Sequence, residues 1–382
     1  MGATSSQLII EMVRSQFKDM DFIPLHAPTF GGNEKKYLSE CIDTTYVSSV
    51  GAFVDHFEHD LSKRIGVPKS VAVVNGTAAL HCALKLLGVD EKQEVLSQAL
   101  TFVATCNAIS YCGAKSVFID VDRDTMGLSP KALTDFLNEF GDRREDGTYN
   151  KKTQKKLGAC VVMHTFGFAA RIEELTAICR DWKIPLIEDA AEAIGSSSHG
   201  KPLGSFGEIG TFSFNGNKII TSGGGGALVS PDETLMIKAK HLTTTAKVPH
   251  SYEFIHDEIG YNYRMPNINA ALLCAQMEQL DYFLERKREL ASFYRKNCDA
   301  NGLVFRWERE NTRANFWLMC IETQDRTERD EILKITNDQK VMTRPIWQLM
   351  YKLPTFSDCQ RDDQQNAEYL EDRIINIPSS VI

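Results

Sequence analysis

The fold is decided where the chain changes from strand to helix within one short stretch, Val71-Ala72-Val73-Val74-Asn75-Gly76-Thr77-Ala78-Ala79-Leu80. The apolar residues predict a buried strand, and the Asn-Gly-Thr turn leads directly into a helix pattern that reaches about Leu87. A Gly-Thr turn at the start of a helix presents free backbone amides, a hydroxyl group and the positive end of the helix dipole. Gly76 and Thr77 could therefore bind a phosphate, although an ordinary helix start explains this turn alone equally well.

The alternation of strand and helix patterns continues through most of the chain. Short apolar runs bounded by turn residues predict further strands, and the stretches between them show helical spacing. The expected strands lie at residues 94–96, 117–122, 159–163, 185–188 and 227–230. Such an alternation is typical of an α/β fold.

Three units are expected along the chain. An amphipathic helix pattern accounts for the N-terminal segment 1–24, and the alternating pattern makes residues 25–250 a large domain. A long helix pattern from about Asn267 to Asn297 ties it to a second, smaller α/β domain, residues 251–382. The charged residues 141–156 interrupt the large domain, and we expect a solvated excursion there because their charges are mixed in sign.

An acid follows the strand pattern in Pro185-Leu186-Ile187-Glu188-Asp189-Ala190-Ala191-Glu192-Ala193. Asp189 should lie at the carboxyl end of its strand, where open α/β sheets bind ligands. An aspartate in that place can pair with a protonated pyridine nitrogen and keep the ring an electron sink. The position also suits the N-cap of a helix, so the motif alone leaves both interpretations open.

A lysine lies between a strand pattern and a glycine run in Phe212-Ser213-Phe214-Asn215-Gly216-Asn217-Lys218-Ile219-Ile220-Thr221-Ser222, which continues into Gly223–Gly226. A turn of this kind can hold the amine where it reaches a small molecule, as a lysine that forms a Schiff base requires. Most lysines are solvated surface charges, so a catalytic role for Lys218 is indicated only together with Asp189 upstream.

Two further side chains follow strand patterns and lie near the expected site. Phe102, at the start of the helix pattern 101–105, could stack on a flat ring, although a core position explains it as well. His164, directly after the strand pattern 159–163, could act as an acid or base, and a structural role is an equal alternative.

The composition is that of a globular protein and argues against several kinds of partner. The 382 residues are 25% charged and carry a formal net charge of −8, which speaks against nucleic acid as the main partner. No apolar run approaches the roughly 20 residues of a membrane span. The ten cysteines form no CxxC pair, so no metal site is expected, and they indicate reduced thiols of a cytoplasmic protein.

Several of these motifs occur together in a fixed order. They are Asn75-Gly76-Thr77-Ala78-Ala79-Leu80, Thr101-Phe102-Val103-Ala104-Thr105, Glu188-Asp189-Ala190-Ala191, Ser213-Phe214-Asn215-Gly216-Asn217-Lys218 and Gly260-Tyr261-Asn262-Tyr263-Arg264-Met265. With them the chain resembles, from about Pro24 onward, the pyridoxal phosphate (PLP)-dependent nucleotide-sugar aminotransferases, the DegT/StrS group of fold type I enzymes. The resemblance implies a large domain with a mostly parallel seven-stranded sheet and a smaller C-terminal α/β domain.

The resemblance also implies roles for the residues around the cofactor ring. Lys218 matches the lysine that forms the internal aldimine and moves the proton between the cofactor and the substrate carbon. Asp189 matches the acid that pairs with the pyridine nitrogen, and Phe102 matches the aromatic residue that stacks on the ring.

A second group of matched positions concerns the cofactor phosphate. Gly76, Thr77 and Ala78 match the phosphate-binding turn, and Ser213 matches a serine on the same phosphate. Asn262 matches an asparagine that reaches the phosphate in the partner subunit. The resemblance therefore implies a homodimer with shared active sites.

Two positions depart from the commoner pattern of these enzymes. The chain has Gly223–Gly226 where Gly-Glu-Gly-Gly is frequent, and Glu192 where glutamine or histidine is frequent. Both variants resemble the subgroup that serves legionaminic acid and bacillosamine synthesis in bacterial surface glycans, and that aminates C4 of a nucleotide-linked 2-acetamido-4-keto-6-deoxyhexose. Glu192 is expected beside the cofactor, where it would change the local proton balance.

The expected reaction passes an amino group from L-glutamate, through pyridoxamine phosphate, to C4 of such a sugar. UDP is favoured as the nucleotide over GDP or dTDP, and amination at C3 stays open. Related 3-dehydratases carry histidine at the position of Lys218, which favours an aminotransferase. Arg264 and Arg344 are candidates for the nucleotide diphosphate, or each could belong to a structural ion pair. The alternative of another class is a non-catalytic regulator that binds PLP or a nucleotide sugar.

Overall fold

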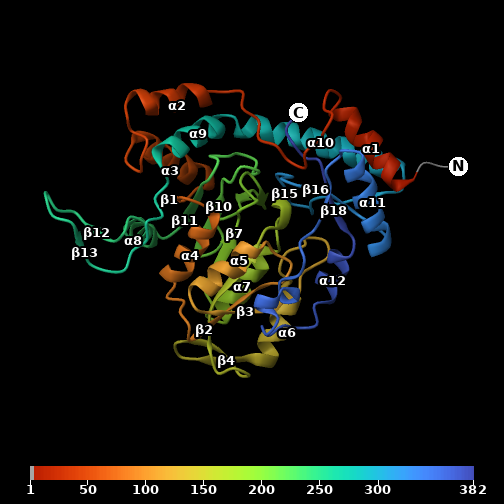
Figure 1. Cartoon of the computed structure of the whole chain (residues 1–382). Coiled ribbons are helices and arrows are strands. Elements are labelled where there is room, and N and C mark those ends of the chain that lie inside the picture. The colour runs from red at the N-terminus through yellow and green to blue at the C-terminus, as the bar shows by residue number, and fades with distance from the viewer. Residues whose placement is uncertain (1–3) are drawn as a thin grey trace.

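A mixed β-sheet forms the centre of the structure, a computed structural model that describes residues 4–382 (Figure 1). Its strand order is β1-β11-β10-β7-β6-β2-β3. The strands from β10 to β3 are parallel to their neighbours, and β11 is antiparallel to both β10 and β1. The predicted mostly parallel sheet is thus confirmed, but among residues 4–382 it has nine strands in place of the predicted seven, because β4 (Gly141–Arg144) and β5 (Gly147–Asn150) pair beside β6. The other strands are β1 (Lys69–Val73), β2 (Gln93–Gln98), β3 (Lys115–Ile119), β6 (Lys156–Met163), β7 (Leu186–Asp189), β10 (Ile209–Ser213) and β11 (Gly226–Ser230).

Both faces of this sheet are covered, which explains why its strands consist of unbroken apolar runs. Along β2, Leu96 packs into one hydrophobic cluster and the preceding Val95 into a second one on the other face. Along β6, Cys160 and Val161 divide between the two clusters in the same way. The helices that connect the strands of this sheet are α4 (Gly76–Leu86), α5 (Val103–Tyr111), α6 (Pro130–Phe140) and α7 (Ile172–Asp181), and α8 (Glu233–Thr243) follows strand β11.

The charged segment 141–156 is more ordered than the sequence predicts. It forms a hairpin, β4 (Gly141–Arg144) and β5 (Gly147–Asn150), which joins the sheet beside β6. Asn150 is completely buried, and its Nδ2 donates a hydrogen bond to Oε2 of Glu94 at 2.8 Å. Residues 143–146 and 151–154 are exposed, as a solvated excursion requires, whereas buried polar contacts hold β5 on the sheet, which the sequence did not predict.

The C-terminal unit contains a separate antiparallel sheet with the order β14-β16-β18-β17. The N-terminal helix α1 packs on this unit, where Oγ of Ser5 donates to Oε1 of Glu328 at 2.9 Å. The first three residues of the predicted segment 1–24 lie outside the described residues. The elements are α1 (Ser5–Gln16), β14 (Val304–Phe305), β16 (Met319–Glu322), α11 (Arg326–Asp338), β17 (Arg344–Pro345), α12 (Gln365–Glu371) and β18 (Ile374–Ile377).

The long helix predicted over residues 267–297 is broken into α9 (Asn267–Glu278) and α10 (Leu280–Ala300). Gln279 lies at the break with φ −103° and ψ −2°, and its Nε2 donates to Oε1 of Glu34 at 2.8 Å. Glu34 begins α2 (Glu34–Asp43), which packs on α9 together with α3 (Ala52–Ile65). The connecting helices thus contact the N-terminal part of the chain at the top of Figure 1.

A hairpin extends away from the rest of the chain at the left of Figure 1. It contains β12 (Lys247–Val248) and β13 (Ile255–His256). Its aromatic and aliphatic side chains face outward, with Tyr252 81% and Phe254 83% exposed. A small third sheet has the order β15-β8-β9, with β8 (Ser197–Ser198), β9 (Lys201–Pro202) and β15 (Thr312–Arg313). Among residues 4–382, none of the helices is both long and apolar enough to span a bilayer.

Candidate active site

A cavity of about 620 Å³ lies where the parallel strands end and the C-terminal unit faces them. It brings together residues from widely separated parts of the sequence, including most of those that the motifs single out. Its lining includes Asn75, Gly76, Thr77, Phe102, Asp189, Glu192, Ser213, Asn217, Lys218, Trp317, Arg344, Trp347 and Asn376.

Asp189 is the last residue of β7 and is almost completely buried. Oγ1 of Thr105 donates to its Oδ2 at 2.7 Å, and the amide of Ala191 donates to its Oδ1 at 3.2 Å. Burial raises the pKa of this carboxyl group, and the two hydrogen bonds oppose the rise. Because residues 190–195 form turns, the alternative of a helix N-cap is not what the structure shows.

Lys218 reaches into the same cavity from the turn that follows β10. Its Nζ lies 3.3 Å from Oε1 of Glu192 and 3.8 Å from the centroid of the Trp317 ring. A carboxyl group and an aromatic face therefore hold the amine at the wall of the cavity.

Glu192 is buried beside this amine. Its Oε2 accepts a hydrogen bond from the amide of Phe166 at 2.9 Å. Burial raises the pKa of Glu192 to about 7, and the attraction of Lys218 offsets only part of that rise. The carboxyl group can therefore exchange a proton close to neutral pH, which is what a proton partner of a catalytic amine requires.

The turn between β1 and α4 forms another wall of the cavity. Gly76 has to be glycine, because a Cβ atom at this position would lie 2.8 Å from Cβ of Ser213. The close approach places Gly76, Thr77 and Ser213 side by side in the lining, as the phosphate interpretation requires. Ala78 does not line the cavity, and its amide donates to Oδ1 of Asn75 at 2.8 Å. The amide of Ala78 thus caps the helix in this structure, and its contact with a phosphate stays a prediction.

Phe102 precedes α5 and is 50% exposed, which excludes the alternative of a core position. Its ring centroid lies 6.3 Å from that of Trp347, which packs on Phe166 at 4.9 Å. A flat ring in the cavity would therefore meet an open aromatic face at Phe102.

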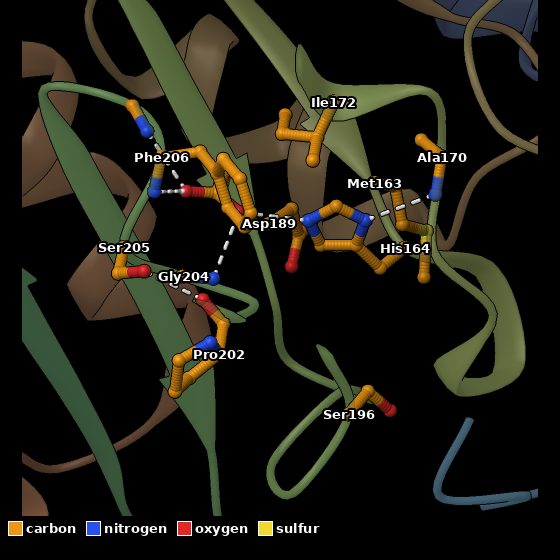
Figure 2. Close-up of polar contacts among 12 residues, drawn as sticks. Met163, His164, Ala170, Ile172, Asp189, Ser196, Pro202, Gly204, Ser205 and Phe206 are labelled. Carbon is orange, nitrogen blue, oxygen red and sulfur yellow. Dashed lines mark hydrogen bonds and ion pairs between the residues drawn. The ribbon is translucent and has the colours of Figure 1, made fainter. Parts of the chain in front are cut away.

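His164 lies outside the cavity, in the packed layer behind β7 (Figure 2). The side chain is completely buried, its Nε2 lies 3.0 Å from Oε2 of Glu188, and the amide of Ala170 donates to its Nδ1 at 3.3 Å. Glu188 also accepts hydrogen bonds from the amides of Gly204 and Phe206. With both ring nitrogens engaged and no part in the cavity lining, His164 has the geometry of the structural alternative, and its role as an acid or base toward the substrate stays a prediction.

The two candidate arginines are separated. Arg344 lines the cavity, and among residues 4–382 no carboxylate lies within 4.0 Å of its guanidinium group. Arg264 lines a different depression, beside Thr244 and the outward hairpin, and Asn262 pairs with Thr244. Within one chain, neither Asn262 nor Arg264 lines the main cavity.

Among the lining residues that sequence reasoning did not single out are Trp317, Trp347 and Asn376. They come from the C-terminal unit, whose short strands carry no turn motif or acid that would single them out. The one signal near them is Arg344, because Trp347 follows it within the same segment.

Comparison with known proteins agrees with this geometry. The model of the DegT/DnrJ/EryC1/StrS aminotransferase family matches residues 28–381. The chain belongs to this family. It is therefore a PLP-dependent aminotransferase of fold type I, and the site described above is the place where its cofactor fits.

Individual relatives cover most of the chain. A GDP-perosamine synthase of Escherichia coli O157:H7 is 37% identical over 360 residues, which are 94% of each chain. A UDP-4-amino-4,6-dideoxy-N-acetyl-beta-L-altrosamine transaminase of Campylobacter jejuni is 36% identical over 252 residues, 66% of this chain and 63% of the relative. The aminotransferase TlmJ of Streptoalloteichus hindustanus shares the fold with a TM-score of 0.84, at 24% identity over 93% of both chains. These relatives do not confirm the expected legionaminic acid and bacillosamine subgroup.

The residues present fit PLP on grounds of their own chemistry. An amine at the cavity wall can form a Schiff base, and a buried carboxylate at a strand end can pair with a ring nitrogen. A tight glycine turn at the start of a helix suits a phosphate group. Lys218, Asp189 and the Gly76–Thr77 turn could hold the cofactor in this way, with Phe102 against its ring.

Proposed function

We propose that the protein transfers the amino group of L-glutamate to C4 of a nucleotide-linked 4-keto-6-deoxy sugar. The observation that carries the proposal is that the Lys218 amine, the Asp189 and Glu192 carboxyl groups and an unpaired arginine line one cavity. The first three suit transamination, and the arginine suits an anionic substrate. The 4-amino-4,6-dideoxy sugar in the name of the Campylobacter jejuni relative supports the choice of C4.

The chemistry that PLP supplies when bound is an electron sink and a carrier for the amine. Lys218 holds and moves the proton at the reacting carbon, since its amine is the basic group that reaches into the cavity. Glu192, at 3.3 Å, takes up or returns that proton, because its pKa of about 7 lies near the working pH. Asp189 would pair with the ring nitrogen of bound PLP, and the hydrogen bond from Thr105 favours the charged form of its carboxyl group. Phe102 and Trp347 give one side of the cavity an aromatic lining.

Two nucleotides remain candidates for the sugar carrier. The variants at Glu192 and Gly223–Gly226 favour the UDP-linked 2-acetamido sugar. The GDP-perosamine synthase of Escherichia coli O157:H7, at 37% identity over nearly the whole chain, favours a GDP-linked sugar. Both acceptors have to be tested together.

We further propose that two copies of the chain form a homodimer in the cytoplasm and complete each other's sites. The outward hairpin exposes Tyr252 and Phe254, which a second copy would cover. Asn262 and Arg264 lie at the base of that hairpin and away from their own cavity, so they are free to reach a neighbouring one. Light scattering of the purified protein tests the dimer, and a monomer at micromolar concentration would contradict it.

The central test follows the visible absorbance of the bound cofactor. Addition of L-glutamate should bleach the band, and a UDP- or GDP-linked 4-keto-6-deoxy sugar should restore it. Lys218→Ala should lack the band, whereas Lys201→Ala, a change at an exposed lysine in β9, should keep it. Bleaching without recovery by either sugar would reject the proposed acceptors. A wild-type band that glutamate leaves unchanged would reject L-glutamate as the amino donor.

A further inference from the structure

We propose that Asn376 and Arg344 together bind the carboxylate of the amino donor, and that Asn376 is a specificity-determining residue for that substrate. The inference rests on the proposed function in one respect, namely that the donor is an amino acid. Arg344 in β17 and Asn376 in β18 lie directly opposite each other in the antiparallel register. Directly opposed residues project from the same face of a sheet, and both of these line the cavity.

Asn376 has a donor without an acceptor. The residue is only 2% exposed, and its Nδ2 finds no hydrogen-bond partner in the part of the chain that the structure describes. Buried amide groups are nearly always hydrogen-bonded in folded proteins, so an orphan in a cavity wall calls for a ligand. A half-turn about the last side-chain bond exchanges oxygen and nitrogen, and the amide can therefore present its N–H groups to a ligand.

Arg344 supplies the charge. Its Nη1 donates to Oδ1 of Asn337 at 3.1 Å and to the carbonyl oxygen of Thr343 at 3.0 Å, which fixes one edge of the guanidinium group. No carboxylate within residues 4–382 neutralises it. Arg306, at the same C-terminal unit, instead pairs with Glu322 at 2.8 Å. An anchored, unpaired guanidinium group beside an orphan amide is a suitable receptor for a planar carboxylate.

The cavity needs such a receptor. Asp189 and Glu192 already place two carboxyl groups in its wall, so an amino acid that carries further carboxylates would be repelled. Lys218 cannot serve as the counter-charge when its amine is bonded to the cofactor. Arg344 is then the cation among the lining residues that stays available.

The depth of Asn376 favours a carboxylate over the nucleotide diphosphate. In an α-amino acid the carboxylate is bonded to the same carbon as the reacting amine. In a nucleotide sugar the diphosphate is bonded to C1, across the ring from C4, and extends outward. Asn376, at 2% exposed, meets groups that lie deep in the cavity, and the exposed Arg344 approaches the same place from the solvent side.

The test uses glutarate, which has the carboxylates of glutamate but no amine to react. Its binding to the PLP-loaded enzyme is measured by titration calorimetry, next to UDP and GDP as separate ligands. Asn376→Ala and Arg344→Gln should each lower the affinity for glutarate about tenfold or more, as expected for a lost hydrogen bond to a charged group. Asn376→Asp should weaken it further, because it adds a like charge. The affinities of these variants for UDP and GDP should change less than about twofold. Arg180→Gln, at an exposed arginine in α7, should leave the affinities for all three ligands unchanged.

The outcomes separate this proposal from the proposed function. If glutarate fails to bind the wild type, or binds all variants equally, the carboxylate site is refuted even when glutamate bleaches the cofactor band. If UDP or GDP loses as much affinity as glutarate, the pair serves the diphosphate and the proposal fails. If glutarate depends on the pair but glutamate leaves the band unchanged, the site stands and the donor is another carboxylate-bearing amine. Should Asn376→Ala fold poorly by circular dichroism, Arg344→Gln decides, since Arg344 is exposed.

Discussion

Glu192→Gln should stabilise the cofactor-free protein at pH 8 and leave its stability at pH 5 nearly unchanged. Burial raises the pKa of Glu192 from 4.5 to about 7 in the folded chain. As the pH rises from 4.5 to 7, the unfolded chain releases a proton that the folded chain still holds, so the free energy of unfolding falls through this window. The rise in pKa corresponds to about 3 kcal/mol at pH 8. Glutamine removes this loss because it cannot ionise.

The substitution is conservative in geometry. The amide oxygen of glutamine can still accept the hydrogen bond from Phe166, which the carboxylate accepts at 2.9 Å. The contact with Lys218 changes, but its attraction is already contained in the pKa of about 7, because Lys218 is among the groups that lower it. The difference at pH 8 therefore measures the net effect of burying the charge.

Urea unfolding at pH 5, 6, 7 and 8, at one protein concentration, measures the difference in the free energy of unfolding between wild type and variant. Glu310→Gln is the matched control, since Glu310 is exposed and should shift stability by less than about 0.5 kcal/mol at every pH. A difference that stays constant from pH 5 to pH 8 would refute the reasoning, because Glu192 would then not titrate in this window.

Three further changes test other parts of the site and the fold. Phe102→Ala should weaken the binding of PLP to the cofactor-free protein about two- to tenfold, the value of one aromatic stack, and equal binding in a fluorescence titration would contradict the stacking role. Lys287→Met should remove the part of the pH dependence of stability that lies between pH 7 and 10. Burial lowers the pKa of Lys287 from 10.5 to about 7, so the folded protein loses stability as the pH falls through that range. Urea unfolding at pH 7 and 9.5 measures this difference, and a variant with the same pH dependence as the wild type would contradict it. Thr105→Val removes the 2.7 Å donor to the Asp189 carboxylate and should cost about 1.5–3 kcal/mol of stability at pH 7, measured by the same method, where a loss below about 0.5 kcal/mol would mean that the bond matters little.

The parts of the site that local sequence determines were predictable. Asp189 and Lys218 each follow a strand of a largely parallel sheet, and the carboxyl ends of such strands meet at one edge. Gly76 follows a strand that also ends at the cavity, and its need for a glycine comes from the neighbouring Ser213. These residues could be placed together without knowledge of the rest of the chain.

The substrate side of the cavity could not be predicted in the same way. Arg344 was a candidate from the sequence, but Trp347 and Asn376 were not, because they reach the cavity through the packing of a second sheet whose strand β17 has only two residues. No periodicity can be read from so short a strand, and its register against β18 depends on contacts that are distant in sequence. Arg264 is the opposite case: its motif predicted a place in the active site, but its side chain lines a different depression of the same chain.

Glu188 and Glu192 show why an acid beside the site is not by itself a functional group. The sequence presents both within one motif, and both are buried. Glu188 precedes Asp189 on β7 and therefore projects to the opposite face of the sheet, where His164 and the amides of Gly204, Phe206 and Gly207 satisfy its two oxygens. Glu192 lies beyond the strand end and has one amide donor and the Lys218 amine. The first carboxylate is held by a network that any proton transfer would disrupt, whereas the second contacts the Lys218 amine at the wall of the cavity. The number and kind of donors, which only the fold provides, decide which of the two can take part in chemistry.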